Sequence, residues 1–60
     1  MEKSIEILIC DDNKEFTQLL AEFLNENQDF NVVGMLYDGE QVLEYLKNNK
    51  NPDVLILDLI

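Results

Sequence analysis

Short aliphatic runs alternate along the chain with segments in which apolar residues recur every three or four positions. The runs at residues 5–10, 30–36 and 53–58 are rich in aliphatic side chains and predict three strands. Residues 13–27 and 39–49 each carry one apolar stripe and predict two amphipathic helices. We expect the stripe of the first helix to pack in the core; it comprises Phe16, Leu19, Leu20, Phe23 and Leu24.

The resulting order, β-α-β-α-β, indicates an α/β fold with a parallel sheet, because strand–helix–strand crossovers are right-handed in nearly all cases. The run at 5–10 is almost continuously apolar, which is typical of a strand buried on both faces. The run at 30–36 is more polar at its start and suits an edge strand. Gly34 within it indicates a bulge or a close backbone approach. Asp38-Gly39 predicts a turn, and Asn51-Pro52 ends the second helix.

Carboxylates stand at the ends of two of these runs. Asp11 and Asp12 follow the first run, and Asp58 closes the third. If those strands are neighbours, the sheet order is 2-1-3 and the three acids meet at its carboxyl edge, where open α/β sheets bind ligands. Such a group of oxygen ligands suits Mg²⁺, and a carboxylate beside a bound cation can accept a phosphoryl group.

Each acid also has a structural explanation. Asp12 and Glu15 fit a capping box at the start of the first helix. Asp11 fits a solvated loop residue, and Asp58 fits the cap of a further helix beyond residue 60. The occurrence of all three together favours a site.

Composition excludes several other functions. The 60 residues include one cysteine and no histidine, so neither a disulfide, nor a zinc site of the Cys/His type, nor a histidine-based catalytic triad is available. Glycine-rich nucleotide-binding motifs are absent as well. We expect Cys10, within the first strand, to act as a buried small hydrophobe rather than a reactive thiol.

The charge balance limits the partners. The formal net charge of −9 argues against direct contact with nucleic acid or an anionic membrane, although acids on helix faces also keep a small domain soluble.

No apolar run approaches the roughly 20 residues of a membrane span, and the first residues lack the anatomy of a signal peptide. A cytoplasmic protein is the expectation.

Two motifs resemble a known family. Asp11-Asp12-Asn13 after an aliphatic strand, and Pro52 to Asp58 as a strand ending in an acid, resemble the receiver domain of bacterial response regulators. The resemblance spans all 60 residues and implies a flavodoxin-like, doubly wound sheet. Within the family, the chain is most similar to the sporulation transcription regulators of spore-forming Gram-positive bacteria.

The resemblance implies a signalling module rather than an enzyme. Asp58 would be the phosphoacceptor, phosphorylated by a phosphohistidine on a histidine kinase or phosphotransferase. Asp12 and Asp58 would bind Mg²⁺ directly, Asp11 largely through water, and the carbonyl of Ile60 would be the third protein ligand. The controlled output would be transcription, carried out by a domain outside this chain.

The chain also departs from the family. Residues 1–60 correspond to the N-terminal half of a receiver, without its fourth and fifth strands or the hydroxyl and lysine residues that follow them. We therefore expect the third strand to be an exposed edge, and the chain to be a loose monomer or to self-associate. Two alternatives remain: a pseudo-receiver or assembly fragment that only packs against another polypeptide, and a fragment of a metal-dependent hydrolase.

Overall fold

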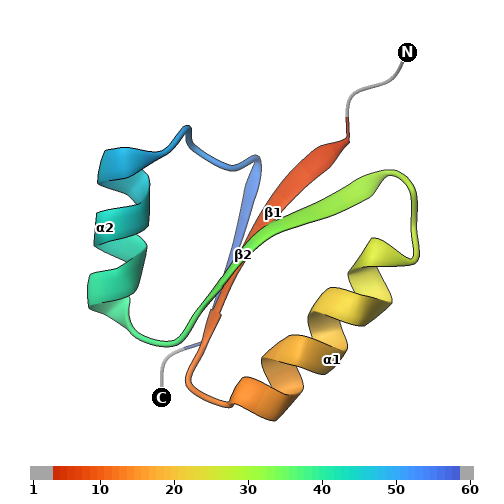
Figure 1. Cartoon of the computed structure of the whole chain (residues 1–60), viewed down its shortest axis with the longest axis horizontal. Coiled ribbons are helices and arrows are strands. Elements are labelled where there is room, and N and C mark those ends of the chain that lie inside the picture. Colours follow the sequence, from red (N-terminus) through yellow and green to blue (C-terminus); the bar gives the residue numbers. More distant parts are fainter. Residues whose placement is uncertain (1–3, 59–60) are drawn as a thin grey trace.

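The computed structural model describes residues 4–58, and its five elements follow the predicted order (Figure 1). They are β1 (Ile5–Asp11), α1 (Lys14–Asn25), β2 (Phe30–Leu36), α2 (Gly39–Asn48) and β3 (Val54–Asp58). Each boundary lies within two residues of the sequence-based prediction. The predicted α/β fold class is confirmed.

The three strands form one parallel sheet in the order β2-β1-β3, as predicted. The two helices lie on opposite sides of the strands (Figure 1). This is the arrangement expected when the chain crosses outward from β1 to β2 and then returns past β1 to β3. The topology makes β1 central and brings the carboxyl ends of β1 and β3 together.

The core is centred on β1, which confirms that this strand is buried on both faces. Ile7, Leu8, Ile9 and Cys10 are all buried. Towards α1, a cluster of Ile7, Ile9 and Ala21 is packed against partly buried neighbours: Leu20, Leu24, Phe30, Val32 and Ile56. Removal of these apolar side chains from water is the main favourable contribution to folding.

The apolar stripe of α1 is only partly in the core, so the prediction that it packs there as a whole is wrong. Phe16, Leu19 and Phe23 are 48%, 66% and 69% exposed, while Thr17 and Ala21 are buried. The helix approaches the sheet through these smaller residues, with Leu20 and Leu24 packed against the core beside them. The sheet therefore covers only one side of the stripe.

Gly34 occupies a tight place in the edge strand β2. The register with β1 shifts there: Ile7 pairs with Val32, and Leu8 pairs with Gly34. A Cβ atom added to Gly34 would lie 2.9 Å from Cδ1 of Leu8 and 3.5 Å from Cε2 of Tyr45. The predicted edge position and bulge are confirmed, and the atoms that approach Gly34 closely are side-chain atoms rather than another backbone.

The predicted turn at Asp38-Gly39 leads directly into α2, which begins at Gly39 as predicted. Asp38 is the N-cap, and its Oδ1 accepts a hydrogen bond of 2.9 Å from the backbone N–H of Gln41. Aspartate is among the preferred residues at this position because it satisfies a helix N–H that has no partner within the helix.

Within residues 4–58, neither helix has the length and apolar character needed to cross a membrane.

Strand β3 forms the second edge of the sheet, as expected. Val54, Leu55 and Leu57 are exposed, and only Ile56 is half-buried and packed against the core. Strands of this composition are normally covered, because an open apolar edge can pair with another chain.

Candidate functional site

The carboxyl ends of β1 and β3 carry the acids singled out in the sequence. Asp11 and Asp58 are direct partners in the parallel register, on strands that lie about 4.8 Å apart in such sheets. Asp12 follows Asp11 at once. Asp11 is only 7% exposed, whereas the side chains of Asp12 and Asp58 are exposed. The predicted adjacency of the two strand ends is confirmed.

The turn after β1 is held by its own side chains. The carboxylate of Asp11 accepts a hydrogen bond of 2.9 Å from the backbone N–H of Asn13. Oδ1 of Asn13 accepts one of 3.0 Å from the N–H of Phe16, and its carbonyl oxygen accepts one of 2.8 Å from the hydroxyl of Thr17. These bonds fix the backbone on both sides of Asp12.

They also correct the capping alternative. The N-cap of α1 is Asn13, not Asp12, so the proposed capping box of Asp12 and Glu15 does not form. A cap bonds an N–H two or three residues further on, and asparagine serves as well as aspartate. Because β1 extends through Asp11, the helix begins one residue later than that box requires, and Asp12 is left to point into solvent.

The three carboxylates are not gathered into a ready-made metal centre. Among residues 4–58, no group of three or more Asp, Glu, Cys or His side chains is placed to hold a metal ion. Ile60 lies outside the described residues. The ligand set of Asp11, Asp12, Asp58 and Ile60 therefore stays a prediction, supported by backbone register rather than by side-chain convergence.

The donor chemistry nevertheless fits the predicted cation. The ligands at this edge are carboxylate oxygens, which hard divalent ions prefer, and Mg²⁺ needs only one or two of them because it retains several waters. One oxygen of Asp11 already accepts the Asn13 N–H, whereas Asp12 and Asp58 are exposed.

Asp38 is a further acid near the end of the sheet that sequence reasoning assigned only to a turn. It follows the edge strand β2, and its carbonyl oxygen lies 3.5 Å from Sγ of Cys10. Burial raises the pKa of the Cys10 thiol, and the negative charges of Asp38 and Asp11 raise it further. A neutral thiol is a poor nucleophile, so the expected role of Cys10 as a buried hydrophobe is supported.

A contact between Lys14 and Tyr37 was not predicted from the sequence. Nζ of Lys14, the first residue of α1, lies 5.3 Å from the centroid of the Tyr37 ring, just after β2. This distance is typical of a cation–π interaction. The two residues are 23 positions apart (37 − 14), and no local pattern signals their pairing.

A surface hollow of about 540 Å³ lies elsewhere, along α2. Its lining is largely polar and consists of Asp38, Glu40, Gln41, Leu43, Glu44 and Lys47. None of Asp11, Asp12 and Asp58 contributes to it. Any chemistry of the three acids therefore belongs to the open end of the sheet rather than to this hollow.

The comparison with protein families agrees with this geometry. The family model of the response regulator receiver domain matches residues 7–60, from the middle of β1 to the end of the chain. The chain belongs to this family. Membership assigns it to two-component signalling, in which receiver domains accept a phosphoryl group from a histidine kinase or phosphotransferase, typically with Mg²⁺. No solved structure gave a significant match.

Proposed function

We propose that this chain is the phosphoacceptor part of a response regulator and that Asp58 is the residue phosphorylated. The observation that carries the proposal is the placement of Asp58 at the end of β3, in register with Asp11 and exposed to solvent. An incoming phosphohistidine can reach a side chain in this position. The family match, which includes both strand ends, supports the assignment.

In the proposed reaction, a carboxylate oxygen of Asp58 attacks the phosphorus atom of a phosphohistidine. An O–P bond forms, the P–N bond breaks, and the electron pair leaves with the imidazole. Mg²⁺, when bound, would neutralise negative charge on the phosphoryl oxygens. Asp12 and Asp58 would be direct ligands together with the carbonyl of Ile60. Asp11, with one oxygen occupied by the Asn13 N–H, would act through water.

The transfer is stoichiometric, so the chain would act as a switch component rather than as an enzyme with turnover. Its finer role would be control of transcription of sporulation genes, through an output domain outside residues 1–60. The protein would act in the cytoplasm. The resemblance of the run from Cys10 through Asn13, and of the ending Leu59-Ile60, to the sequences of sporulation regulators supports this. The net charge of −9 supports the view that this segment does not itself contact DNA.

We further propose that residues 1–60 form the N-terminal half of a receiver. Two uncovered apolar surfaces support this. One is the edge strand β3, with Val54, Leu55 and Leu57 exposed, and the other is the outer side of the α1 stripe. In isolation, these surfaces favour self-association.

The alternative is a pseudo-receiver that acts only by packing against another polypeptide. One observation favours it: the carboxylates of the described residues are not gathered around a metal position. The two functions differ in whether Mg²⁺ binds at the end of the sheet, which makes metal binding the deciding property.

A Mg²⁺ titration followed by two-dimensional amide NMR tests the proposal. We expect peaks near Asp11, Asp12, Asp58 and Ile60 to shift, and the shifts to be lost in Asp12→Ala and in Asp58→Ala. Asp29→Ala is the matched control, because it removes an exposed carboxylate beside the start of β1, at the other end of the sheet. Unchanged Mg²⁺ affinity in both site variants would favour the pseudo-receiver.

A further inference from the structure

The contact between Lys14 and Tyr37 lies beside the proposed metal site. Lys14 is two residues from Asp12, and Tyr37 is next to Asp38. Because α1 follows β1 and Tyr37 follows β2, the contact joins the ends of two neighbouring strands. It therefore spans part of the end of the sheet at which Asp11 and Asp58 are paired.

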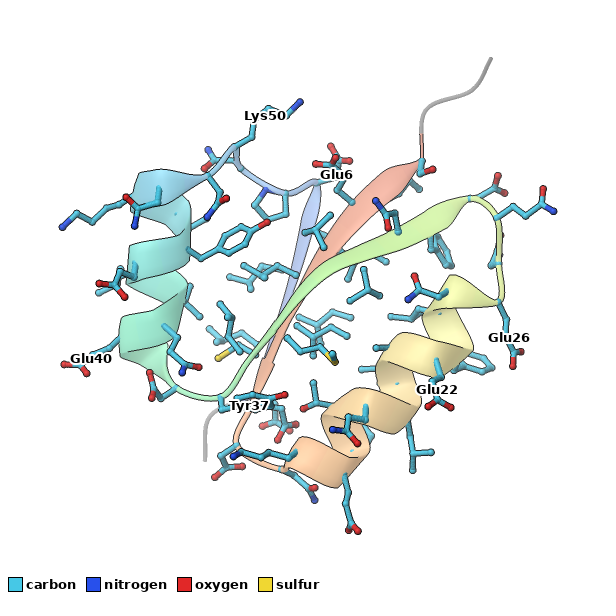
Figure 2. The ribbon with its side chains drawn as sticks, viewed as in Figure 1. Glu6, Glu22, Glu26, Tyr37, Glu40 and Lys50 are labelled. Carbon is cyan, nitrogen blue, oxygen red and sulfur yellow. The ribbon has the colours of Figure 1, made fainter. Side chains whose placement is uncertain are left out.

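Lys14 is also the only cation at that end among residues 4–58. The other lysines of this part of the chain, Lys47 and Lys50, lie at or just beyond the end of α2. A crossover helix runs antiparallel to its strands, so the end of α2 lies beside the starts of the strands. Figure 2 shows Lys50 and Tyr37 at opposite ends of the sheet.

Two forces act on the Lys14 ammonium. The positive end of the α1 dipole disfavours a cation in the first helical turn. The carboxylates of Asp11, Asp12 and Asp58 attract it, and its long flexible stem lets it turn towards them. An ammonium placed among those carboxylates would compete with Mg²⁺ for the same oxygens.

The face of the Tyr37 ring is an alternative binding position for the Lys14 ammonium. The backbone N–H of Tyr37 donates a hydrogen bond of 2.7 Å to Oε1 of Gln41, and the side chain is half-buried. On the other side, the Asn13 cap fixes the backbone that leads into Lys14. The backbone that carries the Tyr37 ring and the start of α1 are therefore both fixed by hydrogen bonds before any ligand arrives.

We propose that Tyr37 holds the ammonium of Lys14 on its ring and so keeps the carboxylates of Asp11, Asp12 and Asp58 available to Mg²⁺. Tyr37 is thus a positioning residue that acts through Lys14. This inference rests on the proposed function, because it assumes that Mg²⁺ binds at this end of the sheet.

The test is a double-mutant cycle with Mg²⁺ alone as the ligand, measured by amide NMR titration. Lys14→Gln removes a like charge near the metal and should tighten Mg²⁺ binding by about two- to fourfold at low salt. Tyr37→Leu frees the ammonium and should weaken binding by about the same factor. In the Lys14→Gln background, Tyr37→Leu should have no effect.

Two conservative variants serve as controls. Tyr37→Phe keeps the ring face and should bind Mg²⁺ like the unmodified chain, and Lys14→Arg keeps both the charge and the ring contact. A readout without metal is also available. The ring current of Tyr37 should shift the ε-methylene protons of Lys14 upfield in the unmodified chain and in Tyr37→Phe, and not in Tyr37→Leu.

Each outcome is decisive. If Tyr37→Leu weakens binding equally in both backgrounds, Tyr37 acts by packing and the inference is wrong. Equal Mg²⁺ affinity in all four members of the cycle also overturns the inference but leaves the proposed function intact. If neither the unmodified chain nor any variant binds Mg²⁺, the proposed function is wrong, and this inference is wrong with it.

Discussion

At the scale of single residues, three adjacent polar side chains in the turn after β1 have different structural roles. Asp11 is buried, and its carboxylate accepts a hydrogen bond from the backbone N–H of Asn13. Asn13 in turn caps α1, whereas the side chain of Asp12 is exposed. The sequence indicated a cap in this region but placed it at Asp12. Aspartate and asparagine are equally good caps, so the choice depends on where β1 ends, which the local pattern does not determine.

This assignment predicts unequal effects of two neighbouring substitutions. Asn13→Ala should lower the free energy of unfolding by about 1 kcal/mol, because the N–H of Phe16 loses its acceptor. Asp12→Ala should change it little, because the exposed Asp12 does not cap the helix. Urea denaturation monitored by circular dichroism measures both free energies of unfolding. If Asp12→Ala lowers this free energy as much as Asn13→Ala does, the capping box of Asp12 and Glu15 is correct after all.

At the scale of elements, hydrophobic periodicity predicted the number, type and order of the elements, because strands and helices differ clearly in their apolar repeat. It predicted the buried face of α1 less well. Periodicity shows that Phe16, Leu19 and Phe23 share a side of the helix, but their exposure depends on how much sheet lies opposite. A three-stranded sheet is too narrow to cover them.

The bulge in β2 is the element feature with the sharpest steric consequence. Gly34→Ala should destabilise the chain by about 1–3 kcal/mol, because the new Cβ would approach the buried Leu8 side chain at 2.9 Å. In a Leu8→Ala background, where Cδ1 is absent, the same substitution should cost much less. Thermal unfolding of the unmodified chain, the two single variants and the double variant measures this coupling, and strictly additive effects would contradict it.

At the scale of the whole molecule, its topology brings together residues that are distant in sequence. The 2-1-3 order pairs Asp11 with Asp58, as strand-end reasoning predicted. The sequence could not indicate how the side chains orient there, since that depends on local bonds such as the one from Asn13 to Asp11. For the same reason it missed the contact of Lys14 with Tyr37.

The exposed apolar surface predicts self-association of the 60-residue chain. Sedimentation should show association that increases with concentration, and also with salt, because salt screens the repulsion between chains of charge −9. Leu57→Lys, on the exposed edge strand, should shift the chain towards monomer. Gln28→Lys adds the same charge in the exposed loop before β2 and is the matched control. A cooperatively folded monomer at all concentrations would contradict the prediction.

The most direct test of the proposed phosphoacceptor role is to locate the phosphoryl group. The chain would be incubated with phosphoramidate, a donor with a P–N bond like that of phosphohistidine, in the presence and absence of Mg²⁺. Intact-mass and peptide mass spectrometry would then follow. We predict Mg²⁺-dependent addition of one phosphoryl group at Asp58, and no addition to Asp58→Asn. No addition to the unmodified chain, or equal addition to Asp58→Asn, would contradict the role of Asp58.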